Sequence, residues 1–401
     1  MQVAILGCGV VGCGTADLIT KNSERLAWLA GEAVEIKYIL ERREMPDSPY
    51  AGLFVKDFDV ILADPDVSVV IEAMGGSHPA FDFSLAALKA SKHVITSNKE
   101  VVANFGHELL SAAKEAGVQY LFEASVGGGI PVIHPLASDL AGNRIDKIAG
   151  ILNGTTNYIL TRMFTAGIDF AEALREAKEK GYAEANPAAD VEGTDACRKI
   201  AILAAVTGGV LVPTDKIHTE GITGIRAVDV SEAAKQGYQI KLLGRMEKTA
   251  LGEMFLMVAP FLVPEESPLA RISDVFNGVL VHGDFVDDVL FYGRGAGAAP
   301  TASSMVGDLV HLLLGGAPTH RPFVRSEEGL TDFSYFVSRH YLALSGVDKN
   351  AVAVIFGDAD FWSEGEELHL LTAELSESEF SDKLNRLLSC GAEQRSHIRL
   401  L

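Results

Sequence analysis

The feature that most constrains the fold is a glycine-rich turn near the N-terminus, Gly7-Cys8-Gly9-Val10-Val11-Gly12. It follows a short apolar segment, residues 2–6, and leads into a helical pattern that runs to residue 19. Between a strand and a helix, such glycines permit a tight turn, let a pyrophosphate approach the backbone and let the helix pack on the strand. The sequence therefore predicts a dinucleotide site at Gly7, Gly9, Val10, Val11 and Gly12. A glycine turn with only a structural role is the alternative.

Strands and helices alternate along the first third of the chain. Strands are predicted at residues 34–40, 67–73, 93–96 and 119–123, and helices at residues 79–90 and 103–116. This repetition is typical of a doubly wound parallel sheet, which binds its ligands at the carboxyl ends of the strands. We therefore expect an α/β, Rossmann-type domain over residues 1–135, closed by the segment around residues 296–317.

The end of the second predicted strand bears on the choice of cofactor. Glu41, Arg42 and Arg43 follow it directly. An acidic residue at this point usually binds the ribose hydroxyl of NAD, whereas an arginine accommodates the 2′-phosphate of NADP. The sequence offers both, and it favours NADP through Arg42, with NAD use also open. Two arginines on a solvated strand end are the structural alternative.

Acidic residues and a lysine gather between residues 181 and 199. Asp195 and Lys199 are four residues apart, so a helix places them on one face, and Glu192 is expected on that face too. Glu184 and Asp190 precede this helix in a segment rich in glycine and proline. Converging carboxylates suit an ammonium group, and a lysine beside them suits proton transfer. An exposed ion pair is the alternative, but the apolar run at residues 200–206 favours a buried helix.

Two loops at predicted strand ends carry further candidates. Lys99 lies in Thr96-Ser-Asn-Lys-Glu100, at the edge where a nicotinamide and a substrate meet, although a lone loop lysine is often only solvated. The loop Glu123-Ala-Ser-Val-Gly-Gly-Gly-Ile-Pro131 frees backbone carbonyls to point at one spot beside Glu123, which suits a hard cation. A glycine turn that leads into a helix is the competing account of this loop.

The overall charge excludes some classes of partner. The 401 residues include 34 basic and 54 acidic side chains, for a net charge of −20. This argues against nucleic acid or an anionic membrane surface as a partner, and no apolar run is long enough to span a membrane. We expect a cytoplasmic protein. The four cysteines, Cys8, Cys13, Cys197 and Cys390, are expected to be small packing residues without disulfides.

The pattern changes after the first domain. Strands are predicted at residues 146–152, 239–248, 253–262, 279–283 and 289–292, and they indicate an α+β domain with an antiparallel-leaning sheet over residues 136–317. A third domain is expected over residues 318–401, and its first residues, 318–325, are predicted to be a linker. There the sequence predicts strands at residues 338–344, 351–356, 368–373 and 398–401 and one helix at residues 376–388.

Seven motifs in the right order make residues 1–315 resemble the homoserine dehydrogenase family. They are GCGVVG, TSNKE, FEASVGGGIP, GILNGTTNYIL, GYAEANPAADVEGTDACRKIAIL, GYQIKLLG and GRGAGAAPTASSMVGDL. The resemblance implies an NAD(P)-dependent oxidoreductase that interconverts L-homoserine and L-aspartate 4-semialdehyde, on the pathway to threonine, methionine and isoleucine. It also implies a monovalent cation, sodium or potassium.

The resemblance also assigns roles to individual residues. Lys199, Asp195 and Lys99 match the catalytic group, and Glu184 and Asp190 match the carboxylates that hold homoserine. Matched cofactor residues are Arg42, Lys99 and Gly297, and matched cation ligands are Glu123, Val126, Gly128 and Ile130, the last three through carbonyls. On physical grounds, the turn of Gly154 and Thr155 at a helix N-terminus suits the substrate carboxylate.

The tail of the chain resembles the family more faintly. Some homoserine dehydrogenases carry an ACT domain at this position, and residues 318–401 are expected to be a degenerate ACT-like α+β module, in which Gly346-Val-Asp-Lys-Asn350 replaces the usual turn and helix. We expect a homodimer or homotetramer built on the second domain. Another NAD(P)-dependent dehydrogenase of an acidic amino acid, or a catalytically silent nucleotide sensor, remains as an alternative function.

Overall fold

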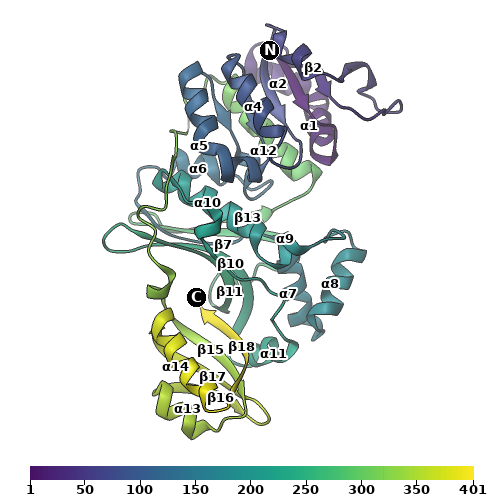
Figure 1. The fold of residues 1–401 in the computed structure, drawn as a ribbon. Helices are drawn as coiled ribbons and strands as arrows, with labels where there is room; N and C mark the ends of the chain where they lie inside the picture. The colour runs from purple at the N-terminus through teal and green to yellow at the C-terminus, as the bar shows by residue number, and fades with distance from the viewer. Residues whose placement is uncertain (319) are drawn as a thin grey trace.

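The computed structural model describes residues 1–318 and 320–401, without the side chain of residue 364. Figure 1 shows three tiers: the N-terminal sheet with its helices at the top, a long sheet in the middle, and the C-terminal strands and helices at the bottom. Among the described residues, no helix is long and apolar enough to cross a membrane.

The first tier is a six-stranded sheet in the order β3-β2-β1-β4-β5-β6, with every pair parallel. This is the strand order of a dinucleotide-binding sheet. The strands are β1 (Gln2–Leu6), β2 (Glu35–Leu40), β3 (Phe54–Val55), β4 (Val67–Glu72), β5 (His93–Thr96) and β6 (Tyr120–Leu121). The helices are α1 (Val10–Lys21), α2 (Ser23–Ala30), α3 (Phe58–Ala63), α4 (Ala80–Lys89) and α5 (Lys99–Ala116).

The glycine turn between β1 and α1 has the geometry that the motif predicts. A Cβ atom on Gly12 would lie 1.9 Å from the carbonyl oxygen of Gly7, so only glycine fits where the helix approaches the strand end. Helix α12 (Ala298–Leu313), far along the chain, packs against α1 in this tier. In Figure 1 it appears as a green helix among the purple and blue elements.

The second tier is built on a mixed sheet whose first strands run in the order β13-β12-β7-β10-β11. These neighbours are all antiparallel, and short β9 pairs with β11 in parallel. The strands are β7 (Ile145–Ile151), β9 (His218–Thr219), β10 (Tyr238–Lys248), β11 (Met254–Pro264), β12 (Phe276–Gly283) and β13 (Asp287–Arg294). A separate pair joins β8 (Val210–Leu211) to β14 (Val324–Arg325).

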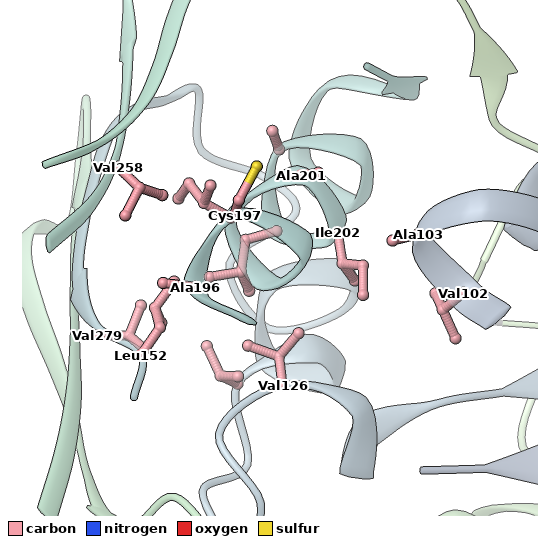
Figure 2. Packing of buried hydrophobic residues seen from close by; sticks show 14 of the residues in the cluster. Val102, Ala103, Val126, Leu152, Ala196, Cys197, Ala201, Ile202, Val258 and Val279 are labelled. Carbon is pink, nitrogen blue, oxygen red and sulfur yellow. The ribbon is translucent and has the colours of Figure 1, made fainter. Parts of the chain in front are cut away.

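Helices cover this sheet and join it to the first tier. They are α6 (Ile133–Ala137), α7 (Gly154–Ala166), α8 (Phe170–Glu179), α9 (Ala188–Val191), α10 (Thr194–Gly208) and α11 (Ala227–Lys235). Helix α10 is the most enclosed of them: Figure 2 shows its side chains packed between Val102 and Ala103 of α5 on one side and Val258 and Val279 of the sheet on the other. The prediction of a buried helix from the apolar run at residues 200–206 is therefore confirmed.

The third tier continues the same sheet. Strand β18 (Glu393–Leu400) pairs in parallel with β11 and antiparallel with β15 (Val337–Ser345), and the order ends with β17 (Leu368–Ser376) and β16 (Ala359–Glu364). With α13 (Lys349–Phe356) and α14 (Glu377–Ser389), the tier has the β-α-β-β-α-β topology of a ferredoxin-like unit.

The structure corrects one element of this tier. Residues 351–356 were predicted as a strand and the usual first helix as missing, but they form most of α13. Asp348 caps this helix by accepting a hydrogen bond from the backbone N–H of Ala351, and its buried residues Val352 and Phe356 are four apart, as on one helix face. The cap and this spacing decide the structure over the β-branched composition of the segment.

Candidate active site

The centre of the candidate site is the carboxylate of Asp195, which lies between two lysines. Its Oδ1 is 2.6 Å from the Nζ of Lys99, and its Oδ2 is 2.6 Å from the Nζ of Lys199. Asp195 and Lys199 lie one turn apart on α10, while Lys99 is the first residue of α5. Asp195 and Lys199 are only 4% and 7% exposed, which excludes the alternative of a surface ion pair.

This arrangement perturbs both members of the buried pair. Burial alone would raise the pKa of Asp195, but the charges of Lys199 and Lys99 outweigh burial and hold this pKa well below its ordinary value. Burial lowers the pKa of Lys199, and the attraction of Asp195 offsets only part of that effect. Lys199 also donates a hydrogen bond of 2.7 Å to the carbonyl of Leu152, which fixes the direction of its amine. A fixed amine with a lowered pKa is suited to exchanging a proton with a ligand.

Asn153 connects the carboxylates and was not predicted as a site residue. Its Nδ2 donates to Asp190 at 2.7 Å and to Asp195 at 2.9 Å, while its Oδ1 accepts from the N–H of Thr156 and caps α7. An asparagine between the end of a strand and a predicted helix start is the signal that identifies it as a cap. Nothing in the sequence indicates that its amide also reaches two aspartates.

A cleft of about 620 Å³ opens above this cluster, between the first two tiers. Glu184 and Asp190 line it as predicted. In the described part of the chain neither carboxylate has a cation partner, and Asp190 has a pKa raised mainly by burial and further by the charge of Asp195. Glu192 was expected on the face of Asp195 and Lys199, but it is exposed and lies before α10 begins, so that expectation is wrong.

The N-terminus of α7 lines the cleft with Gly154 and Thr155. The Oγ1 of Thr155 donates a 2.6 Å hydrogen bond to the carbonyl of Tyr182. The N–H of Thr156 is bound by the Asn153 cap, whereas among the described residues no partner accepts a hydrogen bond from the N–H of Gly154 or Thr155. Free N–H groups at a helix N-terminus favour an anion.

Two helix N-termini form the cofactor side of the cleft. Val11 of α1 lines it from the glycine turn, and Gly297 lines it directly before α12. Neither helix has a side-chain cap, so their first N–H groups are left for a ligand such as a pyrophosphate. Val10 is 74% exposed beside this turn. The residues present therefore fit a dinucleotide.

The glycine turn also contains a feature that contradicts the sequence analysis. Cys8 and Cys13 do pack against the core of the first tier, but their sulfurs are joined in a disulfide, with the two Cα atoms 4.9 Å apart. The five-residue separation brings them together because Cys8 lies in the turn and Cys13 lies in the first turn of α1. Cys197 and Cys390 are free, as expected, but only Cys197 is buried as a packing residue; Cys390 is exposed, so that expectation is wrong for it.

At the end of β2, Glu41 and Arg42 differ in exposure and in hydrogen bonding. Glu41 is buried, and its carboxylate accepts hydrogen bonds from the N–H of Cys8 and from the backbone and guanidinium of Arg43. The Arg43 side chain is the main cause that lowers the pKa of Glu41 to about 2. Arg42 is exposed. The carboxylate is therefore already engaged, whereas the Arg42 guanidinium is accessible.

The predicted cation segment is buried beside the cleft. The carboxylate of Glu123 accepts hydrogen bonds of 2.6–2.8 Å from the N–H groups of Val132, Ile133 and His134 at the start of α6. Within the described residues, no hydrogen bond ends on the carbonyl oxygens of the four predicted ligands Glu123, Val126, Gly128 and Ile130. Nor does that part of the chain hold a metal-binding group of three His, Cys, Asp or Glu side chains. Any cation site here therefore depends on carbonyls.

The cleft has further lining residues that sequence reasoning missed. They are Ser97, Ser125, Arg294 and Thr301. The hydroxyl of Ser125 is buried and has no hydrogen-bond partner among the residues that the structure describes, and the guanidinium of Arg294 lies 5.2 Å from the ring centroid of Phe276. Arg294 lies in the motif GRGAG, so the sequence placed it near the cofactor segment but did not indicate that its side chain lines the cleft.

Comparisons with known proteins agree with this geometry. One family model, described as homoserine dehydrogenase, matches residues 131–310, and another, described as homoserine dehydrogenase, NAD binding domain, matches residues 7–123. A homoserine dehydrogenase of Synechocystis sp. is 44% identical over 321 residues, which cover 78% of this chain and 73% of the relative.

Solved structures extend the likeness over the whole chain. A crystal structure of a homoserine dehydrogenase from Thiobacillus denitrificans is 33% identical, with a TM-score of 0.93, and the match covers 100% of this chain and 98% of that one. A hyperthermophilic archaeal homoserine dehydrogenase in complex with NADPH is 24% identical with a TM-score of 0.68, covering 80% of this chain and 99% of the other, and this likeness shows the fold alone.

Proposed function

The chain belongs to the homoserine dehydrogenase family, and from this premise we propose how its own residues hold the substrate and move the proton. Its activity is the interconversion of L-homoserine and L-aspartate 4-semialdehyde with a nicotinamide cofactor, a step of the aspartate pathway. The single observation that carries the assignment of roles is the Lys99–Asp195–Lys199 cluster at the bottom of the cleft.

We place the substrate by matching its charges to the cleft. Glu184 and Asp190 have no cation partner among the described residues, so they bind the ammonium group of homoserine. The free N–H groups of Gly154 and Thr155 bind its carboxylate. A substrate held at both of these groups presents its remaining end, the hydroxyl or aldehyde, to the lysines. The nicotinamide, when bound, exchanges a hydride with the carbon of that end.

Lys199 is the proton-transfer residue in this proposal. In the oxidation of homoserine its neutral amine accepts the proton of the hydroxyl, and in the reduction of the aldehyde its ammonium returns that proton. Asp195 holds the amine in place and also contacts the Nζ of Lys99 at 2.6 Å. Lys99 then stabilises the negative charge that develops on the substrate oxygen. This divides between the two lysines the roles that the sequence left open.

We propose NADP as the preferred cofactor, bound by the turn of Gly7, Gly9 and Gly12. The carboxylate of Glu41 is engaged by Arg43 and Cys8, which leaves it poorly placed to accept from a ribose hydroxyl, while Arg42 is exposed beside it. An Arg42→Ala variant should raise the KM for NADP and leave that for NAD unchanged in steady-state assays. Equal effects on both cofactors would remove Arg42 from this role.

Two further proposals concern the cation and the assembly. The carbonyls of Val126, Gly128 and Ile130, which accept no hydrogen bond among the described residues, suit sodium or potassium beside Glu123, and activity in either chloride should exceed that in choline chloride. The edge strand β13 exposes Tyr292 and suits a homodimer or homotetramer, which light scattering measures. A location in the cytoplasm stays a prediction.

The roles of the lysines are tested with matched substitutions. Lys199→Met removes a buried amine from the cleft, whereas Lys241→Met removes an equally buried amine whose partners are Asn157 and Ile272, outside it. Reduction of NADP with homoserine should fall about 100-fold or more in Lys199→Met. Lys241→Met should keep most of the activity of the parent chain, provided that thermal unfolding shows both variants folded. Parent-like turnover by Lys199→Met would refute its role.

A further inference from the structure

The buried arginine at the end of the chain joins the C-terminal tier to the second tier. Arg399 of β18 is 2% exposed, and its guanidinium contacts two carboxylates. One is Glu377 at the start of α14, within the C-terminal tier, and the other is Glu220, which follows β9 in the second tier and lies 2.9 Å away. The ring of Phe333 lies under the guanidinium at 5.1 Å. One charge therefore holds two carboxylates from different tiers.

Glu220 belongs to a segment that is fixed by its backbone as well. Its N–H donates a 2.7 Å hydrogen bond to the carbonyl of Val258 in β11, and its Oε1 contacts the ring of His218 at 2.6 Å. Two residues after Glu220, the N–H of Ile222 donates a hydrogen bond to the carbonyl of Val191 at 2.8 Å. The segment thus connects the central sheet to the short helix α9.

The contact with α9 is unusually close. A Cβ atom on Gly221 would lie 2.2 Å from the carbonyl oxygen of Val191 and 2.7 Å from the Cα of Glu192, so the two backbones touch directly. Val191 follows Asp190, and the turn after it leads through Gly193 into Asp195. A displacement of the segment at residues 220–222 would therefore reach the two aspartates of the cleft through backbone contacts, without a flexible side chain between them.

From these contacts we propose that Arg399, through Glu220, is a positioning element of the substrate site, which makes the C-terminal tier part of the support of Asp190 and Asp195. The proposal rests on the roles given above to these two aspartates. Arg399 touches neither the cleft nor a ligand, so it acts only through the Glu220 segment. Because a misplaced binding group weakens turnover even when the fold is intact, the effect belongs in the kinetics for homoserine.

The two carboxylates on Arg399 provide a matched experiment. Glu220→Ala and Glu377→Ala each leave Arg399 with one carboxylate, so both should lower the thermal unfolding temperature. Only Glu220→Ala loosens the segment that supports the cleft. It should lower kcat/KM for homoserine about tenfold or more while the KM for the nicotinamide cofactor stays at the parent value. Glu377→Ala should keep the parent kinetics for both substrates.

Controls separate this effect from others. His218→Gln removes the imidazole that contacts Glu220 and stacks on the ring of Phe333 at 3.6 Å, but it leaves the pair of Glu220 with Arg399, so it should keep the homoserine kinetics near those of the parent. If Glu220→Ala does not fold, Glu220→Gln keeps its volume and removes its charge, and a smaller loss in the same direction is expected. Equal kinetic changes in the Glu220 and Glu377 variants, or an unchanged kcat/KM in a folded Glu220 variant, would overturn the proposal. An inactive parent chain would instead refute the proposed function.

Discussion

At the scale of single residues, the candidate site depends on one buried carboxylate shared by two ammonium groups. A buried charge is tolerated only when it is paired and hydrogen-bonded, and Asp195 meets both conditions through Lys99, Lys199 and Asn153. Removal of one partner leaves the charges of the remaining groups uncompensated in a buried position. Substitutions here should therefore change activity and stability together, and a test must separate the two.

Asn153 allows that separation because it has two functions. Asn153→Ser keeps a side-chain oxygen that can cap α7, whereas Asn153→Ala does not, and both remove the amide donors to Asp190 and Asp195. Both should lower kcat/KM for homoserine about tenfold, from the loss of hydrogen bonds to charged groups. Only Asn153→Ala should also lose the cap, about 1 kcal/mol of unfolding free energy in denaturant titrations. Parent kinetics in Asn153→Ser would contradict the role of its amide.

The pH dependence of the reaction should follow two perturbed groups. Lys199 accepts a proton only when neutral, so kcat for homoserine oxidation should rise with pH through the pKa of Lys199, which burial lowers, and the rate of reduction should fall over the same range. Asp190 must be ionised to hold an ammonium, and its pKa is raised by burial and by Asp195. The KM for homoserine should therefore rise as pH falls through that pKa.

Profiles of kcat and kcat/KM against pH check both expectations, the rise of kcat through the pKa of Lys199 and the rise of KM below the pKa of Asp190. Asp190→Asn is the comparison. The variant bears no carboxyl group at this position, so the acid-side rise in KM should disappear even though binding is weaker at every pH. An acid limb that stays in place in Asp190→Asn would assign it to another group.

At the scale of elements, α10 shows what the sequence predicts well. Its run from Ile200 to Val206 is apolar on all sides, and Figure 2 shows why: the helix lies between α5 and the sheet, so residues 200–205 are buried and only Val206 is partly exposed. Ile202 points toward Ala103 across the interface with α5, the helix that begins with Lys99. Packing at this point therefore sets the distance between the helices that carry the two lysines.

Shortening Ile202 tests that packing. The side chain is fully buried, so Ile202→Ala should lower the free energy of unfolding by about 2–5 kcal/mol and Ile202→Val by about 0.5–1.5 kcal/mol. Val354→Ala removes a side chain that is 82% exposed and should change it by less than about 0.5 kcal/mol. Denaturant unfolding measures all three. A loss below 1 kcal/mol in Ile202→Ala would mean that α10 and α5 close over the gap.

Other elements show where sequence reasoning fails. Residues 351–356 are rich in β-branched side chains and were predicted as a strand, yet Asp348 and the spacing of Val352 and Phe356 make them a helix. Glu192 was placed on the wrong face because the helix was expected to begin before Gly193. The first error concerns the type of an element and the second where an element begins. In both, the residue before the helix, Asp348 or Gly193, carries information that hydrophobic periodicity does not. Lys199 and Asp195 became candidates because charge beside an apolar run is visible in the sequence, and Lys99 became one because its loop follows a predicted strand.

At the scale of the whole molecule, the sequence predicts the tiers and the return of residues 296–317 to the first tier, but not how the C-terminal tier joins the central sheet. The doubly wound parallel sheet of the first tier follows from its glycine turn and its alternation of strands and helices, whereas its strand order comes from the structure. Nothing in the composition of residues 393–400 indicates that they pair with β11 rather than only with their own tier. Pairing between distant strands depends on the arrangement of everything between them, so the Arg399 contact with Glu220 was also beyond prediction.

That continuity predicts how a shortened chain behaves. A chain that ends at residue 332 keeps the pair of β8 with β14 but loses β18, which frees the backbone of Phe261 and Leu262 in β11. It also leaves Asp229 without Tyr341 and Ser396, and Glu220 without Arg399. Unpaired strand edges promote association, and buried carboxylates without partners cost stability. The shortened chain should therefore unfold at a lower temperature and form larger particles with rising concentration in light scattering. If the shortened chain keeps the parent unfolding temperature and a constant particle size, the C-terminal tier does not stabilise the central sheet. The support that Arg399 gives to the cleft would then have no structural basis.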